Sequence, residues 1–319
     1  MSSSMSGLRI AAMGECMAEF APLSSSGYQL GFAGDTYNTA VYLKRLLGNY
    51  HAVSYVTCVG DDDLSVQMLD HIREEGIDTK LCFVEKGASI GAYLISNTDK
   101  GERRFTYWRK HSAATYLLDN KRYDTLLRDL ARFDLIYVSG ISLAILTSEN
   151  RQRLLSLLRE LDVPLAFDPN YRPQLWRDVD EASEVCANTA AISQYLLTTY
   201  DDDQQMWGVD NPMAALKYWQ SHSNAEIVIK NGSNEAFFSE GSHRDTPAPS
   251  VTAPSSIAPS RTIAPKDTTG AGDSFNAAYL ASRLRGENMQ TAVAKAHDLA
   301  AQVITFQGAI LPIGSHRSN

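Results

Sequence analysis

The stretch of the chain that decides the fold lies near its C-terminal end and reads Asp267-Thr268-Thr269-Gly270-Ala271-Gly272-Asp273. Apolar residues at helical spacing follow it, at Ala277, Leu280, Ala281 and Leu284. The glycines are therefore expected to end at a helix N-terminus. Glycine lacks a Cβ and lets backbone N–H groups crowd an anion, and the positive end of a helix favours a phosphate. The stretch predicts a phosphate-binding turn.

Asp273 falls in the first turn of that expected helix, and its carboxylate has two interpretations. It could cap the helix by accepting backbone N–H groups. It could also act as a general base, accepting the proton of a hydroxyl that attacks a phosphorus atom. Spacing alone leaves both interpretations open and leans toward the cap.

Length and composition limit the class of protein. The chain has 319 residues, which fits one large α/β domain or one domain with an appendage. Its net charge of −8 argues against a general nucleic-acid or anionic-membrane binder. The widely spread cysteines, Cys16, Cys58, Cys82 and Cys186, indicate neither a disulfide framework nor a zinc site. With no targeting signal readable at the N-terminal end, we expect a cytoplasmic protein.

Strand and helix patterns alternate along most of the chain. Short apolar runs predict strands over 8–13, 53–59, 134–139, 163–167, 194–198 and 225–230. Helices are expected over 35–47, 61–72, 122–131, 148–161, 178–190 and 212–221. This alternation is typical of βαβ units and a mainly parallel sheet, whose ligands bind beyond the carboxyl ends of the strands.

Two segments break the alternation. Runs over 90–96 and 103–108 flank Asn97-Thr98-Asp99-Lys100-Gly101 and predict a hairpin, with Arg103 and Arg104 on its solvated faces. The stretch 242–266 is rich in Pro, Ser, Ala and Thr and is expected to be a surface loop. The chain contains neither a P-loop string nor a G-x-G-x-x-G string, so these two nucleotide-binding folds are poor interpretations.

The Thr-Thr-Gly-Ala-Gly-Asp string resembles the C-terminal signature of the ribokinase-like (PfkB) carbohydrate kinases. The resemblance covers nearly the whole chain. It implies one kinase domain over 1–319 with a three-layer αβα fold, a mainly parallel central sheet and a small β lid built from segments 14–37 and 88–112. It also implies that Asp273 is the general base, that the amides of Gly270, Ala271 and Gly272 form an anion hole, and that Thr268 joins the two glycines in binding the nucleotide.

The sugar side of the resemblance lies in the first two thirds of the chain. Gly14 to Glu19 is similar to the opening strand and loop of the family, and Phe32-Ala33-Gly34-Asp35-Thr36-Tyr37-Asn38 matches its N-terminal signature, with Ala33 in place of the first glycine. The resemblance implies sugar contacts from Gly34, Asp35 and Asn38. Without the family, Asp35 and Asn38 would be read as helix caps.

Within the family, the pattern is closest to the kinases of 2-keto-3-deoxygluconate. Tyr107-Trp108-Arg109 and Asp168-Pro169-Asn170-Tyr171-Arg172 carry this likeness. It implies that Arg109 and Arg172 bind the carboxylate of a sugar acid, a geometry that suits guanidinium groups. It further implies substrate contacts from Tyr93, Tyr107 and Asp168.

The nucleotide side follows from the same likeness. Thr199 and Asp202 stand where the family has an Asn-x-x-Glu element, so both side chains are shorter here. Mg²⁺ is expected near Asp202 through water, and Lys230 and Gly232 are expected beside ATP. Alternatively, Thr199 and Asp202 simply form the acidic start of a helix and do not bind the nucleotide. Asn276 and His297 are expected near the adenine, with little weight.

The resemblance as a whole implies an ATP-dependent kinase that converts 2-keto-3-deoxygluconate to its 6-phosphate. Two alternatives stay open: a kinase for another sugar such as fructose or ribose, and a non-catalytic member that binds sugar and ATP. The expected partners are the sugar acid and ATP, with no nucleic acid and no membrane. Lids of this kind often pair between subunits, so a homo-oligomer is expected, and a need for a monovalent cation is left open.

Overall fold

The computed structural model describes residues 7–23, 26–97, 103–119, 122–241 and 254–313. Its main feature is a 9-stranded sheet with the order β13-β12-β11-β10-β9-β8-β1-β4-β5. The strands from β11 to β5 are parallel, and β12 and β13 add an antiparallel edge. The strands are β1 (Arg9–Met13), β4 (Ala52–Val59), β5 (Asp78–Val84), β8 (Leu135–Ser139), β9 (Leu165–Asp168), β10 (Tyr195–Thr199), β11 (Glu226–Lys230), β12 (Ala236–Ser239) and β13 (Ser255–Ile257).

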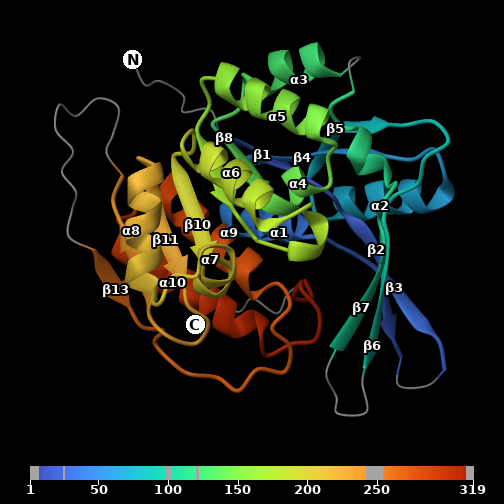
Figure 1. The fold of residues 1–319 in the computed structure, drawn as a ribbon. Coiled ribbons are helices and arrows are strands. Elements are labelled where there is room, and N and C mark those ends of the chain that lie inside the picture. Colours follow the sequence, from blue (N-terminus) through green and yellow to red (C-terminus); the bar gives the residue numbers. More distant parts are fainter. Residues whose placement is uncertain (1–6, 24–25, 98–102, 120–121, 242–253, 314–319) are drawn as a thin grey trace, which may run out of the picture.

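Helices cover both faces of this sheet and give the predicted three layers (Figure 1). One face packs on α1 (Asp35–Leu47), α2 (Asp63–Glu74), α9 (Ala271–Leu284) and α10 (Met289–Val303). The other packs on α3 (Tyr123–Leu130), α4 (Gly140–Ala144), α5 (Ser148–Glu160), α6 (Val179–Ala190), α7 (Tyr200–Trp207) and α8 (Pro212–His222). Because both faces are covered, central strands such as β8 are buried throughout, which explains their continuous apolar runs.

A 4-stranded sheet projects from one end of this core, as Figure 1 shows. Its order is β3 (Tyr28–Ala33), β2 (Met17–Pro22), β6 (Ala92–Asn97) and β7 (Arg103–Trp108). β6 and β7 pair antiparallel, from Ala92 opposite Trp108 to Asn97 opposite Arg103, which confirms the predicted hairpin. Residues 98–101 of its expected turn lie outside the described residues. All four strands fall within the segments 14–37 and 88–112.

The expected strands and helices are confirmed within one or two residues at most ends, and the acidic residues Asp61-Asp62-Asp63 stand at the start of the expected helix over 61–72. Asp62 is the N-cap of α2 and accepts a hydrogen bond from the amide of Ser65 at 2.8 Å. The pattern missed β5, β12 and β13. β5 is an edge strand with an irregular register against β4, so its alternation is weak. β13 lies inside the stretch expected to be a loop, of which residues 242–253 are outside the described part of the chain.

None of the helices in these described stretches combines the length and the apolar character that a membrane crossing needs.

Candidate active site

The candidate site is a cavity of about 780 Å³ that lies at the carboxyl ends of the parallel strands and under the small sheet. Asp168 ends β9, Thr199 ends β10 and Lys230 ends β11. Of the residues that the sequence predicted for the site, all but Asn276 line this cavity: Gly34, Asp35, Asn38, Tyr93, Tyr107, Arg109, Asp168, Arg172, Thr199, Asp202, Lys230, Gly232, Thr268, Gly270, Ala271, Gly272, Asp273 and His297. The fold therefore brings together residues from both ends of the chain.

The predicted phosphate-binding turn ends at the N-terminus of α9. Gly270 is the N-cap with φ 77°, and a Cβ there would lie 2.5 Å from the carbonyl oxygen of Ala309. Both the backbone angle and the space therefore require glycine. The amide of Ala271 donates to the carbonyl of Thr268 at 3.2 Å. That amide is thus already engaged in the turn, and its place in an anion hole stays a prediction.

Asp273 does not cap α9. Its carboxylate oxygen Oδ2 instead accepts a hydrogen bond from Nδ2 of Asn38 in α1, at 2.8 Å. Burial raises the pKa of Asp273 to about 7, the charge of Asp35 adds to the rise, and the Asn38 contact opposes it. A carboxylate with a pKa near neutrality, facing a cavity beside a helix N-terminus, is suited to accept a proton.

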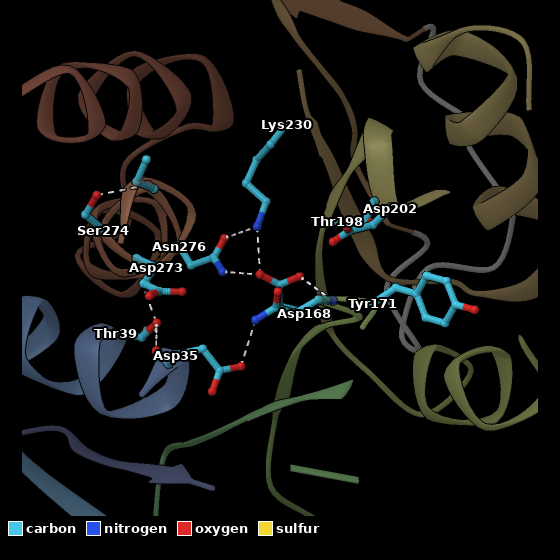
Figure 2. A network of polar contacts seen from close by, with 12 residues as sticks. Asp35, Thr39, Asp168, Tyr171, Thr198, Asp202, Lys230, Asp273, Ser274 and Asn276 are labelled. Atoms are coloured by element: carbon cyan, nitrogen blue, oxygen red, sulfur yellow. Dashed lines mark hydrogen bonds and ion pairs between the residues drawn. The ribbon is translucent and has the colours of Figure 1, made fainter. Parts of the chain in front are cut away.

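A buried ion pair fixes the floor of the cavity (Figure 2). Nζ of Lys230 lies 2.7 Å from Oδ2 of Asp168, and the two side chains are 8% and 4% exposed. Asn276 joins them, accepting from Lys230 at 3.0 Å and donating to Asp168 at 2.6 Å. Asn276 is fully buried in this network, which differs from the adenine-side position expected for it.

Asp35 is connected to the same floor by a residue that the sequence analysis did not select. Nδ2 of Asn170 donates to Oδ2 of Asp35 at 2.8 Å, and the amide of Asn170 donates to Oδ1 of Asp168 at 3.0 Å. Asn170 has φ 35°, a region that asparagine tolerates better than most residues. The Asp-Pro-Asn string after β9 was the available signal, since it is typical of a turn.

Of the two glycine positions in the N-terminal signature, the first holds Ala33 and the second Gly34. Ala33 ends β3 and pairs with Met17 of β2. Gly34 is the position without space, because a Cβ there would lie 2.2 Å from the carbonyl oxygen of Glu15. The second glycine of the signature is therefore the one that this backbone requires.

Arg109, directly after β7, lines the cavity and lies against a buried carboxylate. Nη2 of Arg109 forms an ion pair with Glu15, which also accepts a hydrogen bond from Ser112. Burial raises the pKa of Glu15, although Arg109 and Ser112 oppose the rise. The Arg109 guanidinium carbon lies 5.9 Å from the ring centre of Tyr107. Glu15 was not among the predicted site residues, although it stood in the quoted opening loop.

The two predicted tyrosines lie side by side on the small sheet. The ring centres of Tyr93 and Tyr107 are 5.7 Å apart. The Tyr93 hydroxyl donates to Glu19 of β2, and its side chain is largely buried. Tyr107 is 45% exposed and faces the open part of the cavity.

Beyond the ends of β9 and β10, Asp202 and Arg172 form an ion pair at 3.5 Å. Burial raises the pKa of Asp202 to about 6, while Arg172 opposes the rise. Asp201 and Asp202 lie in the first turn of α7 and also line the cavity. The two interpretations of this segment, an acidic helix start and a part of the site, are therefore compatible. Among the residues that the structure describes, no group of three or more His, Cys, Asp or Glu side chains could hold a metal ion.

Arg103 is not a solvated face of the hairpin. Its guanidinium lies 2.6 Å from Oδ2 of Asp267, and Nη1 also donates to the hydroxyl of Thr269 at 3.3 Å. The Arg103 side chain is 22% exposed, whereas Arg104 beside it is exposed. Nothing in the sequence pattern signalled this contact, because its partners are more than 160 positions away.

The buried pair gives a test of stability. Replacing Lys230 by Met should lower the free energy of unfolding by about 3–5 kcal/mol, because Asp168 would remain buried without its cation. Urea unfolding followed by circular dichroism measures this loss. Lys295→Met is the control, since its pair with Glu287 is 52% and 25% exposed, and about 1 kcal/mol or less is expected. Equal losses in the two variants would contradict the role given to Lys230.

Comparison with known proteins matches this chain to carbohydrate kinases over nearly its full length. The model of the pfkB family carbohydrate kinases matches residues 8–315. The 2-dehydro-3-deoxygluconokinases of Escherichia coli and Dickeya dadantii are each 38% identical to this chain over 310 residues, covering 95% of it and 97% of each relative.

Two solved structures share the fold. The aminoimidazole riboside kinase of Salmonella enterica, complexed with aminoimidazole riboside and an ATP analog, has a TM-score of 0.76 and 22% identity, with 94% of each chain covered. A putative ribokinase II from E. coli, in complex with ATP and Mg²⁺, has a TM-score of 0.75 and 18% identity, covering 95% of this chain and 94% of that one. With its three-layer fold, its turn at α9 and this match over nearly its full length, the chain belongs to the pfkB family of carbohydrate kinases.

Proposed function

We propose that this protein uses ATP to phosphorylate 2-keto-3-deoxygluconate, also called 2-dehydro-3-deoxygluconate, on its 6-hydroxyl. The observation that carries the proposal is the position of Asp273. Its half-buried carboxyl, whose pKa is raised to about 7 chiefly by loss of hydration, lies at the N-terminus of α9 in one cavity with Arg109 and Arg172. The name of the relatives at 38% identity supports the choice of sugar acid.

In the proposed reaction, the 6-hydroxyl oxygen attacks the γ-phosphorus of ATP. The bond between that phosphorus and the β,γ-bridging oxygen breaks, the hydroxyl proton passes to Asp273, and ADP and the 6-phosphate leave. Asn38 holds the Asp273 carboxylate through Oδ2, at 2.8 Å. The unpaired amides at the start of α9, with Gly270 and Gly272 allowing close approach, stabilise the charge that develops on the transferred group.

ATP is proposed to lie over the ends of β10 and β11, between Thr199, Gly232 and His297, all of which line the cavity. Mg²⁺ fits the same end, because carboxylates suit this ion and it keeps several of its waters. Asp202 would hold it through water. The ion would neutralise charge on the phosphates, which is its usual contribution in phosphoryl transfer.

The small sheet is proposed to act as a lid of a single kinase domain over 1–319, with segments 14–37 and 88–112 forming the lid. Tyr93, Tyr107 and Arg109 reach the cavity from this sheet or directly after it. Closing it over the sugar would exclude water, which otherwise competes with the sugar hydroxyl for the phosphoryl group. The four cysteines are free thiols, and we place the protein in the cytoplasm, where thiols stay reduced.

The assembly is proposed to be a homo-oligomer that pairs through the small sheet. This sheet exposes Tyr28 at 53% and Trp108 at 57% of their surfaces, and its outer strands β3 and β7 are edges that pairing would cover. Light scattering should therefore give a mass at least twice 35.1 kDa. A particle of the single-chain mass at micromolar concentration would count against this assembly.

The substrate is tested by ADP release from Mg-ATP with 2-keto-3-deoxygluconate, its galacto epimer, gluconate, fructose and ribose. We expect selective turnover of the keto-deoxy acid. Arg172→Gln should lower kcat/KM for the acid by roughly 10- to 100-fold, which corresponds to the free energy of one charge-assisted hydrogen bond. The slow turnover of neutral sugars should stay unchanged.

Arg177→Gln is the matched control for this variant. Arg177 is exposed, pairs with Asp178 and does not line the cavity, so its replacement should leave every rate unchanged. Preferred turnover of fructose or ribose would assign the protein to another sugar. Binding of sugar and ATP without turnover would assign it to the non-catalytic class.

The pH dependence tests Asp273. Because its pKa is raised to about 7 by burial and by the charge of Asp35, the base is protonated in most molecules at pH 6. The rate kcat/KM should therefore rise roughly tenfold per pH unit below 7 and level off above it. Asp35→Asn removes the charge that raises the pKa of Asp273 most. The midpoint of the pH profile should therefore move to lower pH, even if the variant binds the sugar more weakly. A midpoint that is identical in both enzymes would contradict this account.

A further inference from the structure

Arg103 joins the small sheet to the loop that precedes α9. It is the first residue of β7, on the same face of that strand as Phe105 and Tyr107, which line the cavity. Side chains of a strand alternate between faces, so Arg104 belongs to the other face. The exposure of the two arginines agrees, since Arg103 is partly buried and Arg104 is exposed.

On the loop side, Arg103 meets a carboxylate that organises the anion-binding turn. Oδ2 of Asp267 lies 2.6 Å from Nη1 of Arg103 and accepts the amide of Gly308 at 2.6 Å. Oδ1 accepts the amide and the hydroxyl of Thr269 at 3.1 and 2.7 Å. Asp267 is 3% exposed, so its contact with Arg103 takes place away from water.

On the sheet side, the charge of Arg103 acts on Glu19, the hydrogen-bond partner of Tyr93. Burial raises the pKa of Glu19, and the Tyr93 hydroxyl and the charge of Arg103 partly offset this rise. Glu19 accepts the hydrogen bond from Tyr93. The Tyr93–Glu19 hydrogen bond and the Arg103–Asp267 ion pair are thus coupled through the charge of Arg103, which opposes the rise in the pKa of Glu19.

We propose that Arg103 is a positioning residue for phosphoryl transfer, which ties the small sheet to Asp267 and Thr269 and so sets the shape of the anion-binding turn when the sheet lies over the cavity. This inference rests on the proposed kinase function. Arg103 does not line the cavity and acts through the turn rather than on the reacting atoms.

The physical reason is the small distance between Arg103 and the turn. Thr269, which Arg103 contacts, directly precedes Gly270, the N-cap of α9. Charge-assisted contacts to a buried carboxylate are among the stronger hydrogen bonds in proteins. A displacement of about 1 Å in a catalytic group can cost about 100-fold in rate. Loss of the tie should therefore affect the transition state more than the binding of either substrate.

The test compares Arg103→Gln with Arg104→Gln, its neighbour on the opposite face. Arg103→Gln should lower kcat by roughly 10- to 100-fold and change KM for ATP by less than about threefold. Arg104→Gln should stay within about twofold of the unmodified protein. Arg103→Lys, which keeps the charge, should recover part of kcat. Combined with Asp267→Asn, the Arg103→Gln loss should be smaller than it is alone, because the partner is already changed.

A second readout needs no turnover. Amide hydrogen exchange of the segment 267–272, measured with no substrate present, should be faster in Arg103→Gln than in Arg104→Gln. If the unmodified protein phosphorylates no sugar on the panel, the proposed function fails and this exchange alone decides whether Arg103 holds the turn. In an active enzyme, equal kcat values for Arg103→Gln and Arg104→Gln overturn the proposal. It is also overturned if Arg103→Gln lowers kcat by the same factor with and without Asp267→Asn. Equal exchange rates overturn it in either case.

Discussion

The constraint on which the site depends is the cost of holding several carboxylates together, with Asp168 buried and Asp35 and Asp273 half-buried. Asp35, Asp168 and Asp273 meet where α1, β9 and α9 converge, and each is held by a side-chain donor. The donors are one lysine and the amides of Asn38, Asn170 and Asn276. An amide offers hydrogen bonds without adding charge, so the site stays anionic enough for a base. The raised pKa of Asp273, caused first by burial, is the result of this arrangement.

Much of this architecture was predictable because it follows local rules. Buried parallel strands produce continuous apolar runs, and the alternation with helices then requires βαβ units. The glycine turn before α9 was predictable for a similar reason, since φ 77° at Gly270 and the contact with Ala309 admit no side chain. Recognition of the family supplied the residues of the cavity, which the fold brings to the ends of adjacent strands.

What the sequence did not reveal depends on contacts between distant segments. Arg103 and Arg104 are indistinguishable in the pattern, yet one is tied to Asp267 and the other is exposed. Asn276 is separated by 108 positions from Asp168, to which it donates. Glu15 belongs to the loop after the first strand, and its role is not visible until Arg109 is placed against it. In each case the strand or helix was predictable, but the partner that determines the side chain's role was not.

If the proposed function holds, the charges in the cavity imply that guanidinium groups alone do not define its specificity for a sugar acid. Carboxylates outnumber lysine and arginine side chains in the lining, and both arginines face one, Arg109 at Glu15 and Arg172 at Asp202. An anionic sugar acid must therefore compete with the protein's own carboxylates. Burial raises the pKa of Glu15, so that carboxyl gives up its charge more readily than an exposed one would. For the proposed substrate, selection of the acid would then depend on how far Glu15 and Asp202 release Arg109 and Arg172. The position of an arginine in the sequence does not encode that property.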